Sequence, residues 1–244
     1  LRIAGQPSIG YLPFVIMQRD NLVEKAAAKH GMPNLKVTWT TFTGSEMMDA
    51  ALLSNNLDIA GGGVPGLITI WDRTRGTARE VRGIASLSRL PMFLVTRNEK
   101  IKTIADFTEN DRIALPGVKR SINAVALNMA AAATFGADKA EKLDHLTLTM
   151  SQPDAAAGLL SKAPGFNSVF STPPYQYQLL DTPGIHKVLD SFDILGPHTL
   201  SIAWTTSAFR TNNPTVYKIF VEALQQSAAV IAADREAAIR HWLT

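Results

Sequence analysis

The sequence predicts an α/β protein with two lobes. Short apolar strands alternate with amphipathic helices along the whole chain of 244 residues, a pattern typical of βαβ units and mainly parallel sheets. The strands fall into two groups, near 1–92 and 97–199, and the last segment is free to return to the first group. Two lobes joined by two crossing strands form a hinge architecture, with a ligand cleft between the lobes.

Lobe I is predicted at 1–92 with 201–244 and lobe II at 93–200, with hinge crossings near 92–97 and 199–205. Glycine and proline residues mark the helix ends in lobe I. Its expected elements are strands at 1–5, 37–41, 57–60, 81–87 and 200–205, one helix over 11–29, short helices after 43 and from 65, an amphipathic helix over 214–232 and a last helix over 234–243.

The segment from Trp39 to Gly66 holds two successive connections from a strand to a helix. Thr43-Gly44-Ser45-Glu46 matches a capping box, in which the first hydroxyl and the last carboxylate each satisfy a backbone amide. Gly61-Gly62-Gly63 predicts a sharp turn after the strand at 57–60, and Pro65 restarts a helix. In an open α/β sheet such loops gather at the carboxyl edge of the strands, where ligands bind.

Lobe II repeats the alternation after a strand at 92–96. Its expected elements are strands at 112–115, 145–150, 167–170 and 185–189, a helical turn at 102–107, an alanine-rich helix from the N-cap Ser121 to Phe135, and helices over 153–162 and from 175. Pro173 and Pro174 remove two amide donors from the last helix start, so this loop is a poor cradle for an anion. Tyr175 there is expected either to wall a flatter ligand or to pack in the core.

The composition excludes several kinds of chemistry. The chain has no cysteine, which removes disulfides, thiolate metal sites, iron–sulfur clusters and a cysteine nucleophile. The formal net charge is only +3, and the longest basic run is Lys119-Arg120, whereas a nucleic-acid interface has a denser basic stripe. No apolar stretch approaches the roughly 20 residues of a membrane-spanning helix.

Catalytic and metal-binding motifs do not occur in the sequence. The five histidines are scattered, and no pair has the spacing of metal ligands. Nucleophile-elbow, dinucleotide-binding and P-loop patterns are missing. Asp58, beside the glycine run, is expected to be a structural cap at the end of its strand rather than a general base. We therefore expect no catalytic residue, no metal and no cofactor.

Helix N-termini are the main candidates for ligand binding. Their unpaired amides and positive dipole ends attract anions, so several of them at one cleft would hold an anionic group. The candidate loops are Gln6–Tyr11, Thr43–Glu46, Gly61–Val64, Lys119–Asn123 and Ser171–Tyr175. The alternative is that these loops are ordinary α/β connections. Likewise, Lys119-Arg120 either adds charge for a sulfonate, nitrate or carboxylate or is a solvated surface pair.

The order of motifs resembles the periplasmic solute-binding proteins of ABC importers in the nitrate/sulfonate/taurine group, which includes alkanesulfonate-binding proteins. The resemblance covers nearly the whole chain. Five segments carry it in the same order: the strand and Gly-Ser loop at 41–46, LDIAGGGVP at 57–65, IKTIADFTENDRIALPG at 101–117, NSVFSTPPYQYQLL at 167–180 and TTSAFRTNNPTVYKIFVEAL at 205–224. The aspartate that the family has near its second-lobe pocket is replaced by the segment 169–172, VFST, so no particular substrate carries over.

The resemblance implies a type II periplasmic-binding-protein fold and a binding protein that is not an enzyme. The lobes would close over a small anionic or polar organic solute such as a sulfonate, taurine or nitrate, and the permease subunits of the importer would recognise the closed form. The chain would act as a monomer in the periplasm, or tethered on the outer face of the membrane, after removal of an export signal before Leu1. The expected ligand-binding residues are Gln6, Ser8, Tyr11, Gly44, Ser45, Gly62, Gly63, Val64, Arg120, Ser121, Thr172 and Tyr175.

Two other functions remain open for the same architecture. Thiamine-pyrimidine synthases resemble this group, but they are associated with a cysteine-rich motif that this chain does not have. The effector-sensing domain of a transcription regulator shares the lobe architecture and would require a preceding helix-turn-helix.

Overall fold

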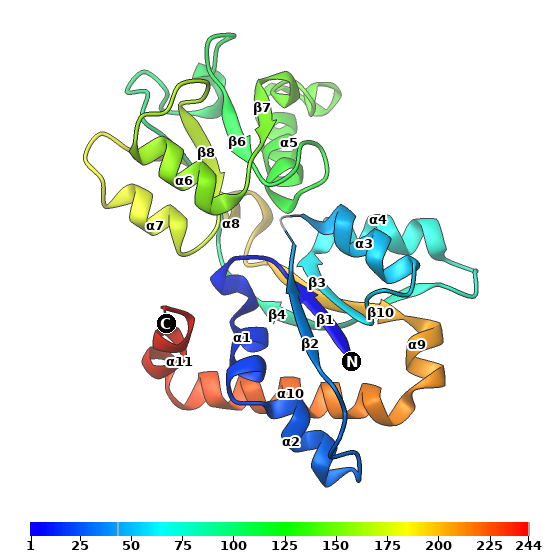
Figure 1. Ribbon diagram of the computed structural model, residues 1–244. Coiled ribbons are helices and arrows are strands. Elements are labelled where there is room, and N and C mark those ends of the chain that lie inside the picture. The colour runs from blue at the N-terminus through cyan, green and yellow to red at the C-terminus, as the bar shows by residue number, and fades with distance from the viewer. Residues whose placement is uncertain (43, 244) are drawn as a thin grey trace. The chain divides into compact units, whose positions relative to one another are not determined.

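The computed structural model describes residues 1–42 and 44–243, without the side chains of residues 45, 46, 241 and 243. The chain forms two compact units (Figure 1). Unit 1 contains Leu1–Ser88 and Ser201–Thr244, and unit 2 contains Arg89–Leu200.

Unit 1 is built on a mixed sheet of five strands in the order β2-β1-β3-β10-β4. The strands are β1 (Arg2–Gly5), β2 (Thr38–Thr41), β3 (Ile59–Gly63), β4 (Val81–Ser88) and β10 (Ser201–Thr206). β1 pairs in parallel with β2 and β3, whereas β10 pairs antiparallel with β3 and β4. The expectation of mainly parallel sheets is therefore wrong, because the returning strand β10 runs against its neighbours.

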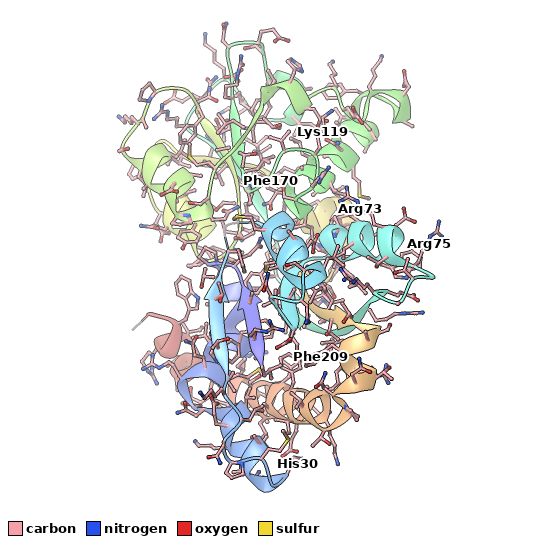
Figure 2. All side chains as sticks on the ribbon, turned by 45° about the vertical axis from the view of Figure 1, so that its right-hand side comes forward. His30, Arg73, Arg75, Lys119, Phe170 and Phe209 are labelled. Carbon is pink, nitrogen blue, oxygen red and sulfur yellow. The ribbon has the colours of Figure 1, made fainter. Side chains whose placement is uncertain are left out.

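Helices cover both faces of the unit 1 sheet. They are α1 (Leu12–Arg19), α2 (Leu22–Lys29), α10 (Pro214–Ala233) and α11 (Arg235–Leu243) on one face, α3 (Ser45–Leu53) and α4 (Val64–Thr74) on the other, and the short α9 (Ser207–Asn212) between β10 and α10. Neighbouring strand residues enter opposite cores: Ile3 packs with α1 and α10, whereas Ala4 packs with α3 and α4. His30, at the end of α2 (Figure 2), ties this helix to α10 because its Nε2 lies 2.9 Å from a carboxylate oxygen of Glu222.

Unit 2 repeats the same sheet with other strands, in the order β7-β6-β8-β5-β9. The strands are β5 (Phe93–Thr96), β6 (Ile113–Leu115), β7 (Thr147–Thr149), β8 (Ser168–Ser171) and β9 (His186–Asp190). β6 pairs in parallel with β7 and β8, and β5 pairs antiparallel with β8 and β9. β6 thus corresponds to β1, and β5 corresponds to β10.

The helices of unit 2 also form two layers on its sheet. They are α5 (Ile122–Phe135), α6 (Gln152–Leu160), α7 (Tyr175–Leu180) and α8 (Ser191–Leu195), with short 3-10 turns η2 (Ile104–Asp106), η3 (Ala137–Lys139) and η4 (Asp144–Leu146). Leu94 and Phe170 pack with α5, whereas Val95 and Val169 pack with α6 and α7. Phe170 (Figure 2) is fully buried and is the largest of the buried side chains in the α5 layer.

The helix expected over 11–29 is two helices. A 3-10 turn, η1 (Ile9–Tyr11), precedes α1, which ends at Arg19, and α2 begins at Leu22. Asn21 lies between them with a φ of 51°, a left-handed conformation that asparagine tolerates better than most residues. The short helices α8 and α9 were not expected from the sequence at all.

The glycine run does not form the expected turn. Gly61 and Gly62 continue strand β3 beside β10, in register with Ala203 and Ile202, and β3 ends only at Gly63. A Cβ atom on Gly61 would lie 2.7 Å from Cε2 of Phe14. The sequence needs glycine here because the Phe14 ring packs directly on the strand.

Candidate functional site

Three loops of unit 1 follow the carboxyl ends of its parallel strands. Gly5 is in register with Thr41, and Ala4 is in register with Ala60, so the loops after β1, β2 and β3 leave the same edge of the sheet. This edge holds the sequence-predicted residues Gln6, Ser8, Tyr11, Gly44, Ser45, Gly62, Gly63 and Val64. Binding of a ligand at this edge is the usual arrangement in open α/β sheets.

The first loop is fixed by its own side chains. The hydroxyl of Tyr11 donates to Oε1 of Gln6 over 2.8 Å, and the hydroxyl of Ser8 accepts from the backbone N–H of Gly10. Burial of the Tyr11 ring raises the pKa of its phenol well above the ordinary value, so the group stays neutral. Ser201, at the start of β10, donates to the carbonyl of Gly10 over 2.6 Å, which anchors the loop to the sheet.

The next two loops of unit 1 end in glycine N-caps. Gly44 precedes α3 and Gly63 precedes α4, and both have extended backbone conformations without a capping side chain. Among the described residues no side chain caps the amides of these first turns, which leaves them available to an external acceptor, except that Pro65 has no N–H. The predicted capping box begins at Thr43, which lies outside the described residues; α3 itself begins at Ser45. Gly62 is buried in β3, one position before Gly63, the N-cap of α4.

Unit 2 has three equivalent loops, after β6, β7 and β8, and serine side chains cap the helices that follow β6 and β7. The hydroxyl of Ser121 accepts from the N–H of Ala124 over 3.2 Å, and that of Ser151 accepts from the N–H of Asp154 over 3.3 Å. Pro174 precedes α7. Ser151 of unit 2 thus supplies an acceptor at the position that Gly44 leaves open in unit 1, whereas the start of α7, like that of α4, has no capping side chain.

A buried amide network supports the third loop of unit 2. The side chain of Gln152 donates to the carbonyl of Phe170 over 3.2 Å and accepts from the hydroxyl of Ser171 and the N–H of Thr172. Asn123 donates to the same carbonyl over 2.9 Å. Asn123 ends the candidate loop Lys119–Asn123, whereas Gln152 was not predicted, although a polar residue directly after a helix N-cap is a usable signal. They hold the predicted residue Thr172 in a buried position.

The other predicted residues of unit 2 lie at or near the surface. Arg120 is exposed, and Tyr175 is half-buried at the first position of α7, where burial raises the pKa of its phenol. Lys119 (Figure 2) has its Nζ 3.8 Å from Glu141 and 3.9 Å from Asp144. The charge of Lys119 is therefore already directed to carboxylates of unit 2.

Asp58 is a structural residue, as its position in the sequence indicated. Its carboxylate accepts from the backbone N–H of Arg2 over 2.7 Å and forms an ion pair with the Arg2 guanidinium. Burial alone would raise the pKa of Asp58, but the hydrogen bonds and the charge of Arg2 outweigh it and lower the pKa. Asp58 precedes β3, at the edge of the sheet opposite the candidate loops.

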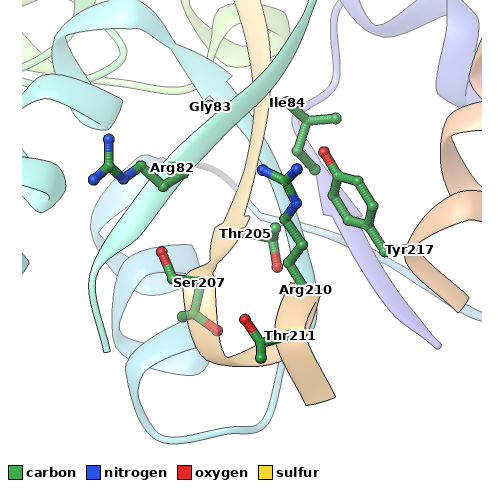
Figure 3. Close-up of a pocket in the computed structure, with 9 residues that line it drawn as sticks. Arg82, Gly83, Ile84, Thr205, Ser207, Arg210, Thr211 and Tyr217 are labelled. Carbon is green, nitrogen blue, oxygen red and sulfur yellow. The ribbon is translucent and has the colours of Figure 1, made fainter. Parts of the chain in front are cut away.

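The same opposite edge of unit 1 carries a hollow of about 590 Å³ (Figure 3). β4, β10, α9 and the start of α10 line it, with Arg82, Ile84, Ser207, Arg210 and Tyr217 among the contributing residues. The hollow lies at this edge because β10 runs antiparallel to β3, so the end of β10 is beside the start of β3. There the hydroxyl of Thr205 donates to the carbonyl of Asp58 over 2.6 Å. None of the predicted ligand-binding residues lines this hollow.

Neither a metal site nor a membrane-spanning helix is found in the described part of the chain. No group of three or more histidine or carboxylate residues there is arranged to hold a metal ion. None of the helices described is both long and apolar enough to span a membrane.

The fold matches solved structures of binding proteins. The alkanesulfonate-binding protein SsuA from Xanthomonas axonopodis pv. citri, bound to MOPS, aligns with a TM-score of 0.73 and 20% identity over 99% of this chain and 77% of its own. The periplasmic nitrate-binding protein NrtA from Synechocystis aligns with a TM-score of 0.75 and 16% identity over 100% and 65%. No model of a known protein family and no curated protein matches the sequence.

A third similar structure is not described as a sulfonate- or nitrate-binding protein. It is a Candida albicans protein described as defining a new family with the generic periplasmic binding protein fold, with a TM-score of 0.70 and 17% identity over 99% of this chain and 74% of that one. The chain therefore has the periplasmic-binding-protein fold, and the resemblance to the sulfonate- and nitrate-binding proteins is confirmed for the fold. At these identities the fold alone does not specify a ligand.

Proposed function

We propose that this protein is the substrate-binding component of an ABC-type importer and captures a small anionic or polar organic solute outside the cytoplasm. The observation that carries the proposal is the pair of glycine N-caps, Gly44 and Gly63, on the loops that follow β2 and β3 at one sheet edge, on either side of β1. Two helix starts without capping side chains offer backbone N–H groups and positive dipole ends to one acceptor group. The similar structures of sulfonate- and nitrate-binding proteins support the same class of ligand.

In this proposal the loops of unit 1 bind the anionic group, and unit 2 contributes Tyr175 and its neighbours to the rest of the solute. A ligand that contacts both units favours a closed arrangement, which the permease subunits of the importer recognise. The proposed ligand is a sulfonate, taurine or nitrate. The proposed location is the periplasm.

A thermal-shift screen tests the function. Purified protein is heated with alkanesulfonates, taurine, nitrate, carboxylates and pyrimidines over a concentration series. A ligand that binds only the folded state raises the melting temperature with the logarithm of its concentration. We expect a saturating shift with one anionic class, confirmed by calorimetry. A shift with pyrimidines alone would contradict the proposal and favour an enzyme of the same fold.

A further inference from the structure

The hollow at the sheet edge of unit 1 opposite the candidate loops has features of a second binding site. One face of α9 lines it with Ser207, Arg210 and Thr211, which are spaced i, i+3 and i+4 and so lie together on the helix surface. Tyr217, near the start of α10, lies beside Arg210 (Figure 3), with the guanidinium carbon 5.2 Å from the centre of its ring. Four polar groups are thus gathered at one hollow from two helices.

The position of α9 is well fixed. The N–H of Ser207 donates to the carbonyl of Glu80 over 2.7 Å, which ties the helix start to the strand beside it. The hydroxyl of Thr206 caps α9 by accepting from the N–H of Phe209 over 3.0 Å. The helix therefore presents its three polar side chains from a rigid support.

These polar groups form no side-chain hydrogen bond or ion pair within the described part of the chain; Arg210 and Thr211 are exposed, and Ser207 and Tyr217 are half-buried. The Arg210 guanidinium has no carboxylate within ion-pair distance there, and its described interaction is with the Tyr217 ring. The side-chain hydroxyls of Ser207, Thr211 and Tyr217 have no hydrogen-bond partner among the same residues. Arg82, which also lines the hollow, differs because its Nη2 lies 2.7 Å from a carboxylate oxygen of Glu80.

The donor set determines the ligand chemistry. No acidic residue lines the hollow, and a guanidinium with several hydroxyl donors matches an acceptor that has several oxygens pointing in different directions. We propose that this hollow binds a tetrahedral oxyanion, phosphate or sulfate, either as the free ion or as the end group of a larger molecule. Arg210 supplies the charge-assisted hydrogen bonds, and Ser207, Thr211 and Tyr217 supply hydroxyl donors.

Amide-resolved NMR tests this site separately from the loop edge. Inorganic phosphate is titrated into the labelled protein, with sulfate, acetate and phenyl phosphate as comparison probes. We expect saturable shifts confined to the segments that line the hollow, residues 82–84, 205–211 and 217, and no saturation with acetate. Tighter binding of phenyl phosphate than of phosphate identifies an end group, whereas equal binding identifies the free ion.

Three variants complete the test. Arg210→Gln is expected to weaken phosphate binding about tenfold, and Tyr217→Phe about threefold, because each removes donors but keeps the bulk of the side chain. Arg73→Gln, which removes an exposed arginine of the same unit outside the hollow (Figure 2), serves as the matched control and should bind normally. The same spectra report whether each variant is folded. The proposal is overturned if phosphate causes no saturable shift at 206–211, or if Arg210→Gln and Arg73→Gln bind it equally.

Discussion

The two units share one sheet plan but differ in how their helices begin. Both sheets have two parallel and two antiparallel strand pairs in the same order. At the carboxyl edge, unit 1 begins two helices with Gly44 and Gly63, whereas unit 2 begins two with Ser121 and Ser151. A serine cap satisfies an amide internally and a glycine leaves it open. The same scaffold thus carries two glycine-capped helix starts in unit 1, where we propose that an anion binds, and two serine-capped helix starts in unit 2.

The units also differ at the opposite edges of their sheets, where the parallel strands begin. Each of these edges has an aspartate, and the groups that bind its carboxylate are different in the two units. Asp58 of unit 1 is paired with Arg2, whose side chain is 39% exposed. Asp111 of unit 2 is buried and accepts from Asn98, Asn167 and both the N–H and the hydroxyl of Thr108. One carboxylate depends on a cation near solvent, and the other depends on neutral donors inside the unit.

The largest expected effect therefore belongs to Asp111. Asp111→Asn places an amide N–H against several donors and should lower the free energy of unfolding by about 3 kcal/mol. Asp58→Asn should lower it by about 1 kcal/mol, because solvent screens the half-exposed Arg2. Urea denaturation measures both. A larger loss for Asp58→Asn would mean that the ion pair, not the neutral network, is the stronger anchor.

The same aspartates predict a pH dependence. Burial would raise the pKa of Asp111, but hydrogen bonds from Asn167, Thr108 and Asn98 outweigh it, so its pKa lies below the ordinary 3.8; the pKa of Asp58 is also lowered. A lowered pKa contributes stability that is present above the ordinary value and is lost as the pH falls through the folded value. We expect the free energy of unfolding to fall below about pH 4, and to fall less steeply in Asp111→Asn.

A second comparison concerns two glycines that each face a phenylalanine. A Cβ on Gly61 would lie 2.7 Å from Cε2 of Phe14, and one on Gly158 would lie 2.6 Å from Cζ of Phe166. The Phe14 ring is held between Trp39 and Phe220, so Gly61→Ala should lower the free energy of unfolding by about 2 kcal/mol. Gly158 lies in helix α6, where alanine gains about 1 kcal/mol in helix propensity, so Gly158→Ala should have a smaller effect. The control is the double variant Gly61→Ala with Phe14→Leu, in which the ring that would meet the new Cβ is removed. Its free energy of unfolding, measured by denaturation, should be higher than that of Gly61→Ala alone.

The sequence predicted those helix starts and ends that are determined by residues close together in the chain. The Ser121 cap, the end of α5 at Gly136 and the start of α4 after Gly63 follow from residues within one helical turn. The glycine run was misread because the contact of Gly61 with Phe14 joins residues far apart in sequence. The antiparallel direction of β10 and the binding of Gln152 to Phe170 are likewise set by tertiary packing, which no local pattern encodes.

Adding a charged cap to unit 1 tests the difference between the carboxyl edges directly. Apart from its chain neighbours, no atom of the described residues lies within 4 Å of a Cβ at Gly44, and the backbone there is extended. Gly44→Asp should therefore fold normally, because aspartate is a good N-cap. Its carboxylate would occupy the helix start and repel an anionic ligand, weakening binding about tenfold.

Calorimetry with the ligand found by the thermal-shift screen measures this effect. Gly44→Ala is the matched control, since it adds the Cβ without charge, and it should change the affinity by less than about threefold. Equal affinity of the Asp and Ala variants would show that the start of α3 does not face the ligand.

The smallest expected effects come from removing the serine caps of unit 2. Ser121→Ala and Ser151→Ala should each lower the free energy of unfolding by about 1 kcal/mol, because each leaves one helix amide without its acceptor. Both hydroxyls are already used as caps, so ligand affinity should change little in either variant. Ser121 is nevertheless among the residues that the sequence predicts to bind ligand, whereas Ser151 is not. If Ser121→Ala weakens binding and Ser151→Ala does not, the hydroxyl of Ser121 serves the helix and the ligand together, and the edges of the two units differ less than their caps indicate.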